Sequence, residues 1–294
     1  MPVDAQTKEN AVNSAIREIS HIATLPEITL KIIQLVESPT STAQDLHKVI
    51  SNDPALCSRI LKVVNSAFYG LPGQVGSINR AIVLLGLNAV KNIAIAASLT
   101  KLFRGGAVTP NFAAKDLWEH SIAVGAASKM IADSLKLAFA DEAFLAGLIH
   151  DLGIVVELQF DRNKLVEAVT RTNVGPDGTP ARGLLDTEDE VFGATHQDFG
   201  SGLCIKWKFP KSFANVTGYH HRPLELADDG RTLACIVAIA DRLAACVKKP
   251  FRLDLTSIEI PSEFLDHIKL TRDASEDIKN KLSAQMETMS QMLN

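Results

Sequence analysis

The sequence has few cysteines, no excess of positive charge and no apolar segment that we expect to cross a bilayer. Its formal net charge is −4 and its sequence pI is about 6.1, so it lacks the basic footprint of a nucleic-acid-binding domain. The run from Ala81 to Ser98 comes closest to a membrane span, but Asn88, Lys91 and Asn92 interrupt it. We therefore expect contact with neither nucleic acid nor a membrane.

The four cysteines are scattered and form no C-x-x-C pair; they are Cys57, Cys204, Cys235 and Cys246. Each lies in an apolar helical context, which is typical of buried free thiols in a reducing compartment. The first six residues also lack the basic and apolar regions of a signal peptide. These features predict a cytoplasmic protein.

Alternation of apolar and polar residues, the mark of a half-buried strand, is absent except for an ambiguous patch from Phe251 to Ile260. Apolar residues recur instead at helical spacing, and helix-start signals such as Asp53-Pro54 and Ser77 precede several of these runs. The sequence therefore predicts an all-α fold. The predicted helices include 55–68, 78–85, 88–103, 113–135, 192–207, 210–221 and 232–247, with one or two more after Pro261.

The clearest break in the chain is Gly105-Gly106 followed by Pro110. We place a boundary there, between an N-terminal helical subdomain of residues 1–105 and a second subdomain of residues 106–294. A hinge between packed helices is the alternative. Residues 161–195 are the least regular part of the sequence, with a turn-rich excursion at 174–180.

One apolar stretch, Glu142 to Glu157, carries an adjacent His150 and Asp151 at its centre. Its spacing predicts a buried helix, with Gly153 as an end or a kink. Burying an imidazole beside a carboxylate is costly unless both are paired. A metal ion would pair with them, and so would a hydrogen-bond network.

The second half of the chain supplies more candidate ligands, each inside or at the end of an apolar helix: His120, His196, His220, His221 and Asp241. Asp116 lies four residues before His120 and so faces the same side of its helix. A single histidine of this kind is more typical of a core or surface position. Imidazoles and carboxylates that converge from separate helices, however, are how helical bundles build one- and two-metal sites.

The order His, His-Asp, His, His-His, Asp resembles the HD superfamily of metal-dependent phosphohydrolases, including its HD-GYP branch. The similarity to the HDOD branch is longer and covers roughly residues 20 to 250. It runs through the segments 25–28, 50–56, 64–70, 78–86, 146–153, 193–196 and 207–210. This resemblance implies an HD-like helical bundle with an N-terminal helical subdomain, and a role in bacterial signal transduction.

The resemblance also implies roles for single residues. It makes His120, His150, Asp151 and Asp241 the primary ligand set, and assigns His196 with His220 or His221 to a second metal. Asp116 falls where some HD-GYP members place an additional acidic ligand. Because the set mixes imidazole nitrogens with carboxylate oxygens, Fe, Mn, Zn, Co or Ni is favoured over Ca²⁺ or Mg²⁺.

Two departures from the phosphohydrolase pattern argue against turnover. Ile154 stands where those enzymes carry a lysine that helps to hold the substrate phosphate, and it can neither donate a hydrogen bond nor carry charge. The Gly-Tyr-Pro motif of HD-GYP members is also absent after His221. Arg222 and Arg242 flank ligand positions and could contact an anion in place of the lysine, or they could be ordinary solvated arginines.

Three functions stay open from the sequence. Our main interpretation is a regulatory module that binds one or two metal ions with little or no turnover, with a signalling protein or a small nucleotide-like ligand as its partner. The alternative is a phosphohydrolase or phosphodiesterase acting on a nucleotide or cyclic dinucleotide, in which Asp151 and a metal-bound water would act. The third is an interaction protein whose histidines form a hydrogen-bonded core. The oligomeric state also stays open.

Overall fold

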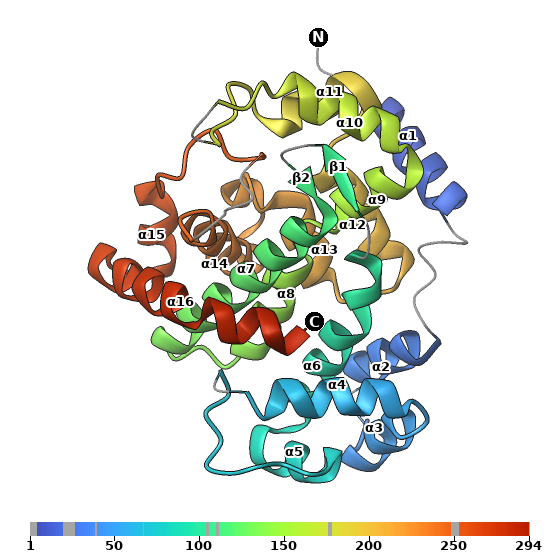
Figure 1. Ribbon diagram of the computed structural model, residues 1–294, viewed down its shortest axis with the longest axis vertical. Helices are drawn as coiled ribbons and strands as arrows, with labels where there is room; N and C mark the ends of the chain where they lie inside the picture. Colours follow the sequence, from blue (N-terminus) through green and yellow to red (C-terminus); the bar gives the residue numbers. More distant parts are fainter. Residues whose placement is uncertain are drawn as a thin grey trace.

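The computed structural model describes residues 5–19, 27–38, 40–66, 68–103, 106–109, 112–175, 178–247 and 253–293. Helices dominate this part of the chain, which confirms the predicted all-α fold (Figure 1). Its strands are the short antiparallel pair β1 (Ala107–Thr109) and β2 (Phe112–Ala113). The patch predicted as an ambiguous strand has none from residue 253 onward, and its first two residues lie outside the described part.

The helices α2 to α6 form the lower part of the molecule in Figure 1. Their bounds are α2 Glu27–Glu37, α3 Ala43–Ile50, α4 Pro54–Val64, α5 Ile78–Leu85 and α6 Leu87–Leu99, and the 3-10 helix η2 (Thr100–Phe103) follows. Asp53 and Ser77 cap α4 and α5 as predicted, since their side chains accept the backbone N–H of Leu56 and Arg80. The capping box of α3 pairs Thr42 with Asp45.

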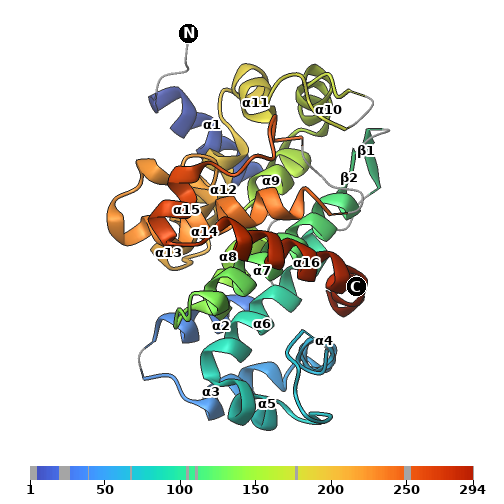
Figure 2. The same ribbon diagram turned by 90° about the vertical axis from the view of Figure 1, so that its left-hand side faces the viewer.

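Helix α1 (Ala5–Glu18) does not pack with this group but lies against α9 and α12 (Figure 2). Val12 and Ile16 sit over Gly202, where an added Cβ would lie 2.5 Å from Val12 Cγ1. The Lys8 amine lies 2.9 Å from Asp189 and 3.6 Å from Asp198. The division at residues 105 and 106 stays a prediction, because Gly105 and Pro110 lie outside the described residues.

The remaining helices lie above this group (Figure 1). They are α7 Ala114–Ser134, α8 Ala140–Ile149, α9 Leu152–Phe160, α10 Arg162–Arg171, α11 Leu184–Phe192, α12 His196–Lys206, α13 Lys211–Tyr219, η3 Pro223–Glu225, α14 Asp228–Ala244, α15 Ser262–Ile268 and α16 Arg272–Leu293. Helices α8, α13, α15 and α16 pack against α7 or α14, while α9 packs against α10 and α12 and α10 packs against α11. The expected irregularity of residues 161–195 is wrong, since α10 and α11 occupy most of this segment. Residues 192–195 also lie outside the following helix, which begins at His196.

The break in the central apolar stretch falls at His150 and Asp151, between α8 and α9, and not at Gly153. Gly153 is needed for another reason: a Cβ there would lie 1.8 Å from the backbone oxygen of His196. Without a side chain at this position, α9 and the start of α12 come into contact, and this contact brings His196 close to Asp151.

Residues Ala140–Phe160 are long and apolar enough to span a membrane by length and composition, a longer apolar run than the sequence analysis found. They are 83% buried within the protein, as in the core helices of soluble proteins, so the run is weak evidence for a span. The four cysteines are free, as predicted. Only two of them are buried, however: Cys204 and Cys235 are, while Cys57 is half-buried and Cys246 is exposed.

Candidate metal centre

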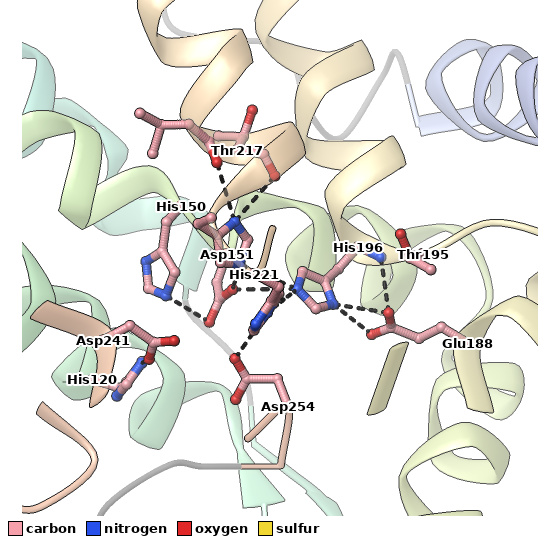
Figure 3. Close-up of polar contacts among 12 residues, drawn as sticks. His120, His150, Asp151, Glu188, Thr195, His196, Thr217, His221, Asp241 and Asp254 are labelled. Carbon is pink, nitrogen blue, oxygen red and sulfur yellow. Dashed lines mark hydrogen bonds and ion pairs between the residues drawn. The ribbon is translucent and has the colours of Figure 1, made fainter. Parts of the chain in front are cut away.

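All seven side chains predicted as metal ligands gather where α7, α12, α13, α14 and the turn between α8 and α9 meet (Figure 3). They come from helix interiors, as His120 and Asp241 do, or from helix ends. His196 is the first residue of α12, His220 caps α13, and Asp151 precedes α9. Helix ends and close helix packing therefore bring together residues that are up to about 120 positions apart in the chain.

The first group of candidate ligands is His120, His150 and Asp241. Its three ligand atoms lie within 4.8 Å of one another, and all three residues are buried. His120 Nε2 lies 3.1 Å from Asp241 Oδ1. This group has the spacing that a single ion needs.

The second group is His196, His220, His221 and Asp254, also with ligand atoms within 4.8 Å of one another. The Nε2 atom of His196 lies 3.4 Å from that of His220 and 3.2 Å from that of His221. Asp254 Oδ2 lies 3.3 Å from His221 Nε2. The sequence analysis missed Asp254, which lies on the loop before α15, in the patch that we took for an ambiguous strand.

Asp151 lies between the two groups. Its Oδ2 atom is 3.1 Å from His150 Nε2, and its Oδ1 atom is 3.4 Å from His220 Nε2 and 3.7 Å from His196 Nε2. Each carboxylate oxygen thus faces a different group, which is the arrangement of a bridging carboxylate.

The buried histidines are oriented by hydrogen bonds at Nδ1. His150 Nδ1 lies 2.7 Å from the carbonyl oxygen of Gly147, and His220 Nδ1 lies 3.2 Å from those of Val216 and Thr217. Carbonyl oxygens only accept, so each Nδ1 carries a hydrogen, and in the neutral ring Nε2 keeps the lone pair. Metal-ligating histidines are held in this way by a second shell of acceptors.

Glu188 of α11 is the second-shell acceptor for His196. Its carboxylate accepts the backbone N–H of His196 at 2.9 Å and lies 2.8 Å from Nδ1 of the same ring. Glu188 is fully buried. The sequence analysis missed it, because we read its segment as irregular. The sequence carried no signal that separates Glu188 from the other acids of α11.

The carboxylates hold protons on two of these imidazoles. Burial opposes the charged form of His150, but the adjacent Asp151 outweighs it and raises the pKa of His150 to about 9. Burial likewise opposes the charged form of His196, while Glu188 and Asp151 raise its pKa to about 10. Burial lowers the pKa of His220 and of His221 to about 3, and neighbouring imidazoles add to the effect.

The pKa values of the carboxylic acids in the centre are shifted in both directions. Burial opposes ionisation of Asp151 and Asp241, but the neighbouring histidines lower the pKa of each below its usual range. Burial raises the pKa of Asp254 to about 7, and the charges of Asp241 and Asp151 add to this. The centre therefore has more negative charge than its own cations offset, and a bound cation would supply the difference.

The donor set fits a metal ion. Neither oxygen of Asp151 or of Asp254 accepts a hydrogen bond from the described residues, although all four oxygens are buried. Leaving buried polar atoms unpaired in this way is costly. Imidazole Nε2 atoms and carboxylate oxygens aimed at the same points are the ligands that transition ions take.

Asp116, predicted as a possible extra ligand, lies outside the centre, and the two arginines predicted as possible anion contacts stay a prediction. Asp116 is exposed at the start of α7, where it accepts the N–H of Ala113 at 2.9 Å. Arg222 is exposed and lies over the ring of Tyr219. Arg242 donates to the carbonyl oxygens of Ala238 and Glu259. Asp116 shares a helix face with His120 but lies about one turn nearer the start of α7, where it is exposed.

A surface pocket of about 540 Å³ leads to the second group. His221, Asp254 and Arg242 form part of its wall, together with Thr256, Ser257 and Glu259. Ile154, which replaces the phosphate-binding lysine of the HD pattern, is fully buried and does not line this pocket. The pocket thus ends at the edge of the centre, where the His221 side chain is about 10% exposed and the Asp254 carboxylate is buried.

The fold and this centre define an all-α domain with a candidate two-metal site. The chain belongs to the HDOD domain family, whose model matches residues 22–223. This confirms the resemblance inferred from the sequence.

Individual relatives agree with this assignment. An HDOD domain protein of unknown function from Geobacter sulfurreducens superposes with a TM-score of 0.79 at 20% identity, over 99% of this chain and 98% of that chain. A candidate phosphohydrolase from Shewanella amazonensis superposes with a TM-score of 0.72 at 22% identity, over 96% and 98% of the two chains. At these identities the similarity shows the fold alone. An uncharacterised protein of Treponema pallidum is 28% identical over 247 residues, which are 81% of this chain but 45% of that relative.

Proposed function

We propose that this HDOD protein is a regulatory module that binds transition-metal ions and turns over substrate slowly or not at all. The observation that carries the proposal is the pair of ligand groups with Asp151 between them, its Oδ2 atom 3.1 Å from His150 and its Oδ1 atom 3.4 Å from His220. His120, His150 and Asp241 would hold one ion, and His196, His220, His221 and Asp254 the other. The mixed nitrogen and oxygen donors favour Fe, Mn, Zn, Co or Ni.

Two observations support little turnover. A bound ion would act as a Lewis acid and would activate water, but hydrolysis of a phosphate ester also needs a group that holds the phosphate. Ile154 supplies no such group, because it is apolar and fully buried. Arg242 is already engaged with two backbone carbonyl oxygens.

Metal content tests the proposal directly. Protein purified without chelators or a metal-affinity tag should carry close to one or two equivalents of a transition metal by elemental analysis. Asp151→Asn should lose most of it, and Asp116→Asn, which changes an exposed carboxylate, should not. Wild-type protein with less than about a tenth of an equivalent, and with a melting temperature unchanged by added Mn²⁺, Fe²⁺ or Zn²⁺, would refute the metal site.

A metal-dependent phosphohydrolase or phosphodiesterase acting on a nucleotide or cyclic dinucleotide is the alternative. The pocket of about 540 Å³ that reaches His221 and Asp254 favours it, and so does the description of the Shewanella amazonensis relative. In that case Asp151 and a metal-bound water would act. Phosphate release in the presence of Mn²⁺, Fe²⁺ or Mg²⁺, at the ordinary enzyme rate of about 1–10³ s⁻¹, would replace the regulatory proposal with this one.

We further infer a cytoplasmic protein whose partner is a signalling protein or a small nucleotide-like ligand, and neither nucleic acid nor a membrane. The net charge of −4 and the free cysteines support this inference. Co-purification of nucleic acid or binding to anionic vesicles would contradict it.

A further inference from the structure

Asp254 reaches the second ligand group from a different kind of element than the other ligands. It lies on the loop between α14 and α15, which has neither helix nor strand from Leu253 to Ile260. Buried Leu253 and Leu255 anchor this loop on both sides of Asp254. Leu184 N–H donates to the carbonyl oxygen of Leu253 at 3.2 Å, which holds the loop against α11. The loop therefore presents the Asp254 carboxylate to the centre.

Asp254 lies in the pocket wall next to His221. Its carboxylate lies 3.3 Å from His221 Nε2, and both residues form the pocket wall that faces the second group. Figure 3 shows the Asp254 side chain directed toward the ring of His221. A molecule that entered through the pocket would meet Asp254 and His221 before the other ligands.

Asp254 also completes the ligand set of the second position. The three imidazoles of His196, His220 and His221 and the Oδ1 atom of Asp151 already offer four donors, and Asp254 makes five. Catalytic metal sites keep one position open for water or substrate, whereas sites filled by protein ligands are structural. The first position has only His120, His150, Asp241 and the other oxygen of Asp151.

No hydrogen bond from the described residues holds the Asp254 carboxylate, and its 3.3 Å contact with His221 Nε2 would break if the carboxylate left. We propose that Asp254 is an intramolecular blocking ligand, which occupies the coordination position that an external oxyanion, such as the phosphate group of an ester, would take. The proposal rests on the metal site proposed above. It gives the regulatory module a built-in closed state, in which the loop and not a substrate fills the second position.

Three variants test the proposal in the full chain. Asp254→Ala removes the carboxylate, and Asp254→Asn keeps its shape while weakening its coordination. Glu259→Ala is the matched control, because Glu259 is an exposed carboxylate of the same loop and pocket wall whose backbone contact to Arg242 is retained. Each protein is loaded with Mn²⁺. Bound metal is counted, metal-bound water is measured by proton relaxation, and inorganic phosphate is titrated by calorimetry.

We expect Asp254→Ala to keep both ions, to gain metal-bound water and to bind phosphate more tightly than wild type by about tenfold or more, which corresponds to 1.4 kcal/mol. The bound water and phosphate affinity of Asp254→Asn should lie between those of Asp254→Ala and wild type. Those of Glu259→Ala should match wild type. Equal phosphate affinity and equal bound water in Asp254→Ala and wild type would overturn the proposal. So would loss of the second ion from both Asp254 variants while wild type binds two, since Asp254 would then be a required structural ligand. Wild type without metal would refute the proposed function itself. If Asp254→Ala does not fold, Asp254→Asn alone decides between these outcomes.

Discussion

Asp151 is the residue on which the proposed centre depends most, because its two oxygens face the two ligand groups. The substitution Asp151→Asn keeps the shape of the side chain and removes its charge. In the metal-free protein the main loss is the charge partner of protonated His150, whose pKa is about 9. At pH 7 this pKa lies about two units above the pH, which corresponds to roughly 3 kcal/mol.

This value also limits the effect. Once the loss of this interaction exceeds roughly 3 kcal/mol, His150 releases its proton instead of staying charged without a partner. We therefore expect metal-free Asp151→Asn to be less stable than metal-free wild type by about 2–3 kcal/mol at pH 7. At about 2–4 °C per kcal/mol, its melting temperature should fall by roughly 4–12 °C.

Metal adds a second difference. An ion at a hundred times its dissociation constant stabilises the folded state by about 2.7 kcal/mol per site. Wild type should therefore melt lower after chelation, whereas Asp151→Asn should show little change because it has lost most of its metal. Differential scanning calorimetry with and without chelator measures both terms, and Asp116→Asn is the control. An Asp151→Asn protein that keeps its metal and its chelator-dependent shift would refute the bridging role.

Three further predictions follow from the structure. Metal binding at pH 7 should release at least about two protons, because His150 and His196, with pKa values of about 9 and 10, are protonated there and must be neutral to bind through Nε2. Calorimetry in buffers of different ionisation enthalpy counts the released protons, and a count near zero would contradict these pKa shifts. Gly153→Ala should lower the free energy of unfolding by about 1–3 kcal/mol or more and lose the second ion, because the new Cβ would lie 1.8 Å from His196 O. Chemical denaturation and metal analysis compare it with Gly76→Ala, which has nothing within 4 Å and should show neither effect. Limited proteolysis should cut first at residues 105–110 or in the excursion at 174–183; early cuts inside the long helices would show that the predicted boundary is wrong.

The sequence was sufficient for the helices and for most of the ligands. Helical spacing and capping residues fixed elements such as α4 and α5, because these signals are local. Histidines in otherwise apolar helices stood out, because an imidazole in a core needs a partner. The break at His150 and Asp151 was misplaced, since no residue there is a helix breaker; the turn is set by tertiary packing of α9 against α12.

Asp254 and Glu188 could not be found in the same way. Asp254 lies in a loop, where no periodic pattern says which side chains are buried, and it meets His221 only after α14 has folded back. Glu188 lies in a helix whose sequence carries several acids, and only the tertiary contact with His196 separates it from exposed Glu190. Asp116 shows the opposite error. Two residues on the same helix face can differ in burial. Asp116 lies in the first turn of α7, where its carboxylate accepts the N–H of Ala113 and caps the helix.

The charges of the centre decide between a metal site and a hydrogen-bonded histidine core. A core of the second kind would pair each buried carboxylate oxygen with a donor, because an unpaired one costs about 1–3 kcal/mol. The Glu188 carboxylate meets that condition, since both of its oxygens contact His196. The carboxylates of Asp151 and Asp254 accept no hydrogen bond from the described residues. Both oxygens of Asp151 and Oδ2 of Asp254 instead face imidazole nitrogens at 3.1–3.7 Å, in ion-pair contacts. Protons on His150 and His196 offset part of the negative charge but sit at separate points. A cation at each convergence point would satisfy these oxygens and the Nε2 lone pairs together, and for this reason we favour the metal site.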